Sequence, residues 1–400
     1  MADNKDKKVL NVPALRFPEF TGEWKRYKLS EVCSFYSGGT PSSSKKEYYN
    51  GNIPFIRSGE LHKDKTELFI TEDGLKNSAA KLVETGDLLL ALYGATSGDI
   101  AISKIKGAIN QAILCIRTKQ NKKFIESVWN KHVEKLLQTY LQGGQGNLSA
   151  DIVKNIPFYF ANLEEQVKLA SFISLLDERI ATQNKIIEKY ESLIQAMCDT
   201  LIDKEKQYVL LSFSDFGQSY SGLSGKSAED FGDGYPFITY MNVYQNQIID
   251  STDVGLVKIN ETEQQSVVRH GDILLTLSSE TPEEVGMGAV YLGETYPLYL
   301  NSFCFGIHIT DEAKIYPPFL AYYVSSQSFR KAVYPLAQGS TRFNLQKSDF
   351  MKKKFSFPVI EKQRIIYSIL RTYSDKLIVE KQIMRLLCNQ KCYLLRQLFI

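Results

Sequence analysis

A chain of 400 residues is long enough for two or three domains with apolar cores of their own. No apolar run approaches the roughly 18 residues of a membrane helix, and the start lacks the apolar region of a signal peptide. We therefore expect a soluble, cytoplasmic protein whose six scattered cysteines stay free thiols. The formal charge of +3 is too small to indicate a nucleic-acid binder by itself.

The chain carries the same series of landmarks twice. At offset 182, NIPFIRSGEL (52–61) recurs as GYPFITYMNV, and at offset 185, TGDLLLALYG (85–94) recurs as HGDILLTLSS. At offset 191, GAINQAILCI (107–116) recurs as LNSFCFGI, and at offset 197, NLSADIVKNIPFYFANLEEQ (147–166) recurs as NLQKSDFMKKKFSFPVIEKQ. Offsets that grow along the chain are typical of insertions in loops. The repeat is domain-sized and far longer than a solenoid unit.

Each half is predicted to mix strands and helices. The Gly-Asp pairs at 86–87 and 271–272 precede short apolar runs, which indicates a turn followed by a strand. The stretches 122–142 and 317–336 have the spacing of short amphipathic helices. The predicted class is therefore α+β, with two α/β globular domains.

A heptad seam follows each globular half. From 163 to about 204 there is no Pro or Gly, and apolar residues step by three and four, as they do again 197 residues later. Polar residues interrupt the seam at Gln183, Glu380 and Lys391, and Asn162 can cap the first helix. The predicted helix-helix interface is Ile173, Leu176, Ile180, Ile187, Tyr190, Ile194, Met197, Leu201, Leu370, Tyr373, Leu377, Met384, Leu387, Leu394 and Leu398.

Charge favours pairing of the two helices with each other. Residues 163–205 sum to −4 and residues 359–400 to +5, while 1–162 sum to +6 and 206–358 to −4. A duplication tends to keep a two-fold relation, which requires the helices to run antiparallel. Two short helices, each packed on its own domain, remain the alternative. We expect globular domains at 1–162 and 206–358, and helices at 163–205 and 359–400.

These motifs resemble the specificity subunit (HsdS) of type I restriction-modification systems. The resemblance rests on PALRFPEFTGEWKRYKLSEVCSFYSGGTPS, GNIPFIRSGEL, TGDLLLALYGATSGDIAI, QGGQGNLSADIVKNIPF and NLEEQVKLASFISLLDERI, then on LSSETPEEVG and GSTRFNLQKSDF. It covers essentially the whole chain, and the uncapped second helix with Glu380 and Lys391 in its seam departs from the pattern.

The resemblance implies two target recognition domains separated by an antiparallel coiled coil. It implies a non-catalytic chain that reads an asymmetric bipartite site in double-stranded DNA. Partners would be two adenine methyltransferase subunits and restriction subunits, and the S-adenosylmethionine, ATP and Mg would belong to those partners.

DNA contacts are expected from loops rich in small polar and basic residues, although ordinary turn chemistry also favours such residues. In the first domain the candidates are Ser37, Gly39, Thr40, Ser42, Lys45, Lys46, Arg57, Thr96, Ser97 and Gln145. In the second they are Lys226, Tyr240, Asn242, Ser278, Ser279 and Arg342. Arg342 is the best single candidate for a base or phosphate contact.

The sequence contains no convincing catalytic motif. The sequence YPPF at 316–319 resembles an amino-methyltransferase motif, but Tyr316 supplies no carbonyl or carboxylate acceptor, so prolines opening a helix explain it better. Walker A, zinc-ligand and nucleophile-base patterns are missing from the sequence. A two-lobed protein-protein adaptor with a coiled-coil scaffold is the alternative function, and a self-sufficient methyltransferase is a weaker one.

Overall fold

The computed structural model describes residues 10–141 and 147–400 and divides the chain into two compact units. The first unit runs to Asn184 and also includes Gln382–Ile400, and the second is Lys185–Lys381. No helix in the described ranges combines the length and apolarity needed to span a membrane.

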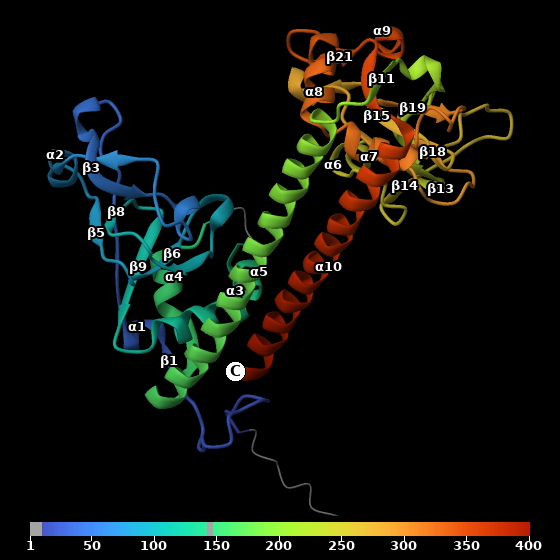
Figure 1. Ribbon diagram of the computed structural model, residues 1–400. Helices are drawn as coiled ribbons and strands as arrows, with labels where there is room; N and C mark the ends of the chain where they lie inside the picture. The colour runs from blue at the N-terminus through green and yellow to red at the C-terminus, as the bar shows by residue number, and fades with distance from the viewer. Residues whose placement is uncertain (1–9, 142–146) are drawn as a thin grey trace, which may run out of the picture. The chain divides into compact units, whose positions relative to one another are not determined.

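The first unit contains two four-stranded sheets and a two-stranded one (Figure 1). One sheet has the order β2-β9-β6-β7 and is built from Cys33–Ser37, Ile113–Thr118, Leu88–Ala91 and Ile100–Ile102. The next has the order β4-β3-β8-β5 and is built from Phe69–Ile70, Tyr49–Ile56, Gly107–Ile109 and Lys81–Val83. The small sheet pairs β1 (Lys25–Lys28) with β10 (Pro157–Phe160).

Helix α3 (Lys122–Leu141) fills the core of the first unit. Its Trp129 is fully buried, and the indole Nε1 donates to the carbonyl of Gly98 at 2.8 Å. Gly98 has φ +87°, and a Cβ there would lie 2.9 Å from a methyl of Val133. The stretch 122–142, predicted to be helical, corresponds to α3, which is a single helix of 20 residues and so longer than the short helix expected.

The second unit repeats this topology. Its main sheet has the matching order β12-β19-β15-β17, from Gly217–Ser221, Cys304–Ile309, Ile273–Thr276 and Gly288–Val290. The next sheet is β14-β13-β18, from Val254–Val257, Phe231–Ile238 and Tyr299–Leu300, and the small sheet pairs β11 (Tyr208–Leu211) with β22 (Phe355–Pro358). As β3 runs parallel to β8, so β13 runs parallel to β18. The predicted duplication is confirmed.

Where the first unit has α3, the second has two helices, α7 (Pro317–Tyr323) and α8 (Gln327–Val333). The break falls at Ser326, whose hydroxyl caps α8 by accepting from the amide of Phe329. The prolines of YPPF open α7, as the sequence indicates. A short sheet specific to this unit joins β16 (Ser278–Ser279), β21 (Phe343–Leu345) and β20 (Ala337–Gln338).

Two long uninterrupted helices, α5 (Leu163–Asp203) and α10 (Ile360–Leu398), follow the two halves of the repeat (Figure 1). They pair antiparallel within each unit. In the first unit, Leu169 near the start of α5 shares a core with Leu398 at the end of α10. In the second unit, Ile202 at the end of α5 shares a core with Ile366 near the start of α10. The antiparallel coiled coil of the predicted fold is thus present.

The predicted seam residues lie on the covered faces of these helices. Each of the predicted apolar positions is buried or half-buried, whereas Leu175, Leu193 and Leu386, outside the seam, are exposed. Asn162 caps α5 as predicted, because its side-chain oxygen accepts from the amide of Glu165 at 2.8 Å.

The structure explains the charged interruption at Lys391. Its Nζ lies 2.6 Å from a carboxylate oxygen of Asp177 on α5, and Lys123 of α3 lies 2.6 Å from the other oxygen of that carboxylate. A carboxylate between two ammonium groups satisfies charges that a half-buried seam would otherwise exclude. Lys391 therefore connects α10 to both α5 and α3.

Candidate nucleic-acid interface

The loop 37–46 follows β2 in the first unit, and its side chains differ in availability. Ser37, Ser42 and Lys46 are exposed. Thr40 donates to the side chain of Gln111 at 2.8 Å, and Lys45 donates to the hydroxyl of Tyr48 at 2.9 Å. Gly39 is buried, and a Cβ there would lie 2.6 Å from Ala79, so this glycine serves close packing.

Arg57 is held by carboxylates. Its guanidinium lies 3.1 Å from Glu60 and 2.8 Å from Glu67. Burial opposes ionisation of Glu60, but hydrogen bonds from Arg57 and Thr66 lower the pKa of Glu60 to about 2. A phosphate or base would have to compete with two carboxylates for this guanidinium, so Arg57 is a weaker candidate than its residue type suggests.

The loop 94–98 is held by hydrogen bonds to backbone carbonyls at the end of the preceding strand. It begins with a short 3-10 helix (Gly94–Thr96), and the hydroxyl of Ser97 donates to the carbonyl of Leu92 at 3.0 Å. The same carbonyl accepts from the amide of Leu148 at 2.9 Å, which brings the chain after α3 beside this loop. Thr96 is half-buried. Gln145 lies outside the described residues.

The corresponding region of the second unit contains a cleft that brings four predicted residues together. Tyr240, Ser278, Ser279 and Arg342 all line it, and we call it the Arg342 cleft. The hydroxyl of Tyr240 donates to the carbonyl of Ser278 at 2.8 Å. The two serines are largely covered, whereas Arg342 is exposed. The anchoring contact also recurs, since the amide of Leu345 donates to the carbonyl of Leu277 at 2.8 Å.

The structure gives the other two candidates of this unit structural partners. The Lys226 side chain is only 4% exposed and forms an ion pair with Glu263. Asn242 is fully buried, and its amide donates to the backbone carbonyls of Asp250, at 2.8 Å, and Asp253. We leave Lys226 and Asn242 out of the proposed contact set.

Sequence reasoning missed the other residues that line the Arg342 cleft, namely Met241, Tyr244, Glu280, Glu284 and Phe303. A signal for Phe303 was present in the repeat. Its counterpart at offset 191 is Ala112, so the second half carries a large exposed aromatic where the first has a methyl group. A comparison of the two halves position by position would have found it.

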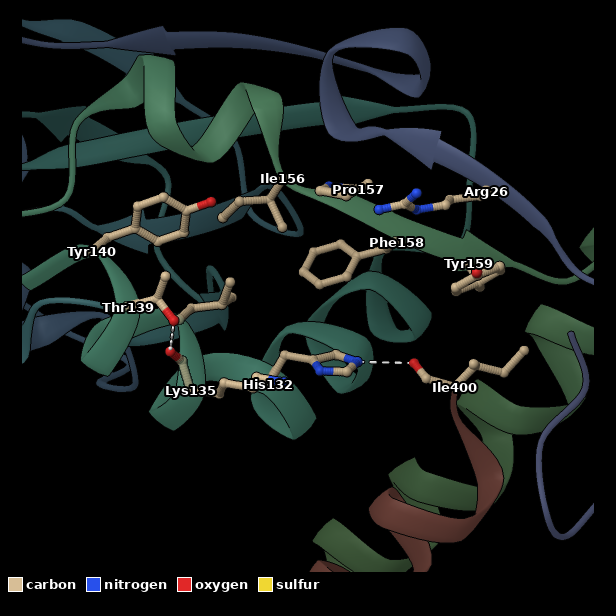
Figure 2. Close-up of a pocket in the computed structure, with 11 residues that line it drawn as sticks. Arg26, His132, Lys135, Thr139, Tyr140, Ile156, Pro157, Phe158, Tyr159 and Ile400 are labelled. Carbon is tan, nitrogen blue, oxygen red and sulfur yellow. Dashed lines mark hydrogen bonds between the residues drawn. The ribbon is translucent and has the colours of Figure 1, made fainter.

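A pocket in the first unit lies among β1, β10, α3 and the end of α10 (Figure 2). His132 points into it, with Nε2 2.9 Å from the carbonyl oxygen of Ile400 and its ring stacked on Phe158. Burial lowers the pKa of His132, which favours the neutral ring. These contacts attach the end of α10 to the first unit, and we assign this pocket a structural role.

The part of the chain that the structure describes holds no group of three His, Cys, Asp or Glu side chains able to bind a metal ion. It contains two units of the same topology, and each unit includes parts of the paired long helices. The two units present different exposed side chains on equivalent loops. This arrangement defines a duplicated two-module recognition protein.

The chain belongs to the family of the type I restriction modification DNA specificity domain, whose model matches residues 21–192 and 212–387. It is a DNA sequence-specificity subunit, and the family agrees with the expectation of a non-catalytic chain. The resemblance noted in the sequence is thereby confirmed.

Curated relatives match over nearly the whole chain. The type I restriction enzyme MjaVIII specificity subunit of Methanocaldococcus jannaschii is 22% identical, over 94% of this chain and 92% of the relative. The MjaIX specificity subunit of the same organism is 23% identical, over 90% and 89%. The crystal structure of the type I restriction-modification system S subunit from M. genitalium has TM-score 0.56 at 16% identity, over 97% and 99%. That structural likeness supports the fold.

Proposed function

We propose that this chain recognises an asymmetric bipartite site in double-stranded DNA. Residues 1–162 read one half-site, and residues 206–358 read the other. The observation that carries the proposal is the repeat itself. Two units of one topology present unlike side chains at equivalent positions, as with Ala112 and Phe303, so the two halves of the target differ in sequence.

The chain acts within a larger complex. It places adenine methyltransferase subunits over the two half-sites, and restriction subunits join for cleavage. One relative by fold was solved in a study of complex assembly and conformational transition of the type I R-M system, with TM-score 0.56 at 16% identity, over 93% of this chain and 96% of that one. S-adenosylmethionine, ATP and Mg are assigned to the partner subunits.

Partner subunits are also needed for affinity. The segment 206–358 sums to −4, whereas phosphate contacts from Lys and Arg supply most non-specific DNA affinity. The second domain therefore contributes more to sequence recognition than to electrostatic affinity for DNA. Binding of the assembled complex to duplex DNA should still weaken as salt increases, because the first domain and the partners release counterions.

The test is base-resolution mapping of N6-methyladenine in cells that express this chain with its methyltransferase partner, compared with cells lacking only this chain. We expect one split, asymmetric motif to depend on the chain. An active methyltransferase with no motif that depends on this chain would refute the proposal.

A further inference from the structure

The Arg342 cleft contains a guanidinium with no partner that satisfies its donors. Among the described residues, Arg342 makes no hydrogen bond or ion pair. Its guanidinium carbon lies over the ring of Phe303, 6.0 Å from the ring centroid. Arg57 is bound by two carboxylates and Lys226 is buried in an ion pair. Among the described cationic candidates outside the loop 37–46, only Arg342 makes no hydrogen bond or ion pair with the described residues.

Large apolar side chains beside Arg342 are exposed. Phe303 is 55% exposed and Met241 is 47% exposed, and both line the cleft. Tyr240 and Tyr244 form a stacked pair beside them, with ring centroids 5.9 Å apart and planes within 17°. Clustered apolar surface of this kind marks a site that a ligand covers. A planar ligand with both apolar and polar edges is complementary to the aromatic and apolar side chains that line the Arg342 cleft.

Acidic groups in the same cleft disfavour phosphate. Glu280 is exposed with no hydrogen bond or ion pair in the described residues, and Glu284 accepts a hydrogen bond from the hydroxyl of Tyr244 at 2.6 Å. That hydrogen bond, together with burial, raises the pKa of Tyr244 to about 12. Two carboxylates repel a DNA phosphate but accept hydrogen bonds from amino groups on base edges.

We propose that the Arg342 cleft reads base edges in the second half-site, with Arg342 donating to a guanine and Glu280 accepting from the amino group of a cytosine. The inference rests on the function proposed above and deepens it. The pairing chemistry is general: Arg donates two hydrogen bonds to O6 and N7 of guanine, and Glu accepts one from N4 of cytosine. Phe303 and Met241 pack against the bases and exclude water.

The experiment uses the full chain assembled with its methyltransferase partner, and N6-methyladenine mapping as readout. The variants are Arg342→Gln and Glu280→Gln. The matched control is Arg269→Ala, because Arg269 is also an exposed arginine of this unit and lies outside the cleft. All three side chains are exposed, and thermal unfolding of each complex checks that it remains folded.

We expect Arg342→Gln to relax one guanine position of the second half-site, with discrimination lowered roughly tenfold to hundredfold. Glu280→Gln should shift a cytosine position towards adenine, because Gln pairs with adenine. The first half-site and the spacer should stay unchanged in both, and Arg269→Ala should keep the wild-type motif.

The alternatives give different results. An unchanged motif in both cleft variants overturns the inference while leaving the specificity role intact. A uniform loss of methylation at all sites in a folded Arg342→Gln complex identifies a phosphate contact and overturns base reading. If the wild-type complex itself methylates no motif that depends on this chain, the proposed function falls and the inference falls with it.

Discussion

Gln166 and Gln363, one at the start of each long helix, make the same two hydrogen bonds. In each, Nε2 donates at 2.8 Å to the carbonyl five residues earlier, which is that of Ala161 or Pro358. In each, Oε1 accepts from the backbone amide of the residue just before a core helix, that of Asn121 before α3 at 3.0 Å or that of Tyr316 before α7 at 2.8 Å. Both glutamines are fully buried.

Replacing either glutamine with leucine should destabilise the unit that contains it. The substitution leaves a buried N–H and a buried carbonyl without partners, and each such group costs about 1–3 kcal/mol. Urea unfolding, followed by hydrogen exchange in each unit, measures the loss. Gln390→Leu, at an exposed position of α10, is the control and should change the free energy of unfolding little. Equal exchange rates in wild type and Gln166→Leu would contradict this role.

The ion pairs of Asp177 predict an acid-dependent loss of stability in the first unit. Burial opposes its ionisation, but hydrogen bonds from Lys123 and Lys391 hold the pKa of Asp177 below its ordinary value. Its contribution is therefore full above the unfolded pKa of about 3.9 and is lost as pH falls through the lower folded value.

The measurement compares wild type with Asp177→Asn by urea unfolding at pH 7 and at pH 3. We expect the variant to be less stable at pH 7, with the difference shrinking at pH 3. In the second unit the equivalent position is Ser374, which does not titrate over this range. A difference that is independent of pH would show that the carboxylate charge contributes nothing.

A buried aspartate before the third strand of each main sheet has different basic partners in the two units. In the first unit, Arg117 lies 3.1 Å from Asp87. In the second, Nδ1 of His308 lies 2.9 Å from Asp272, whose other contacts are the hydroxyl of Tyr220 and a backbone amide. Burial raises the pKa of Asp272, whereas hydrogen bonds from the backbone amide of Glu84, from Arg117 and from Lys122 outweigh burial and lower the pKa of Asp87.

We therefore expect His308→Arg to lower the pKa of Asp272 towards the behaviour of Asp87, because arginine stays charged at every relevant pH. In the wild type, the raised pKa means that stability from Asp272 is full below its unfolded value and is lost as pH rises through the folded value. Carboxyl NMR titration of the variant measures the change. A pKa of Asp272 that does not move would refute the role assigned to the cation.

The paired helices predict how the target spacer responds to length. Adding seven residues at equivalent positions of both α5 and α10 preserves the heptad register and lengthens a helix by about 10 Å. The spacer between half-sites should grow by about three base pairs, at roughly 3.4 Å each. Methylation mapping reads the spacer directly. A change in both half-site sequences, or a spacer of unchanged length, would show that the length of these helices does not set the spacer.

Much of the fold was predictable because the two halves of the repeat can be aligned with each other. The offsets between landmarks located equivalent strands, and the seam positions located the covered helix faces. The contact residues were less predictable, because availability depends on partners that are distant in sequence. Arg57 meets Glu67, and Lys226 meets Glu263, through folding that no local pattern reveals. The break of the second core helix at Ser326 was likewise hidden, since its cap depends on local backbone geometry.

The backbone hydrogen bonds beside the loop 94–98 and beside the Arg342 cleft have a consequence for evolution. In each unit the loop path is fixed by main-chain groups, with the amide of Leu148 bonded to the carbonyl of Leu92 and the amide of Leu345 to that of Leu277. Amides and carbonyls are common to nearly all residues, so the exposed side chains of the loop 94–98 and of the Arg342 cleft can be exchanged by mutation while these backbone contacts persist. New target sequences can thus arise in such a lineage by small substitutions, without passing through unfolded intermediates.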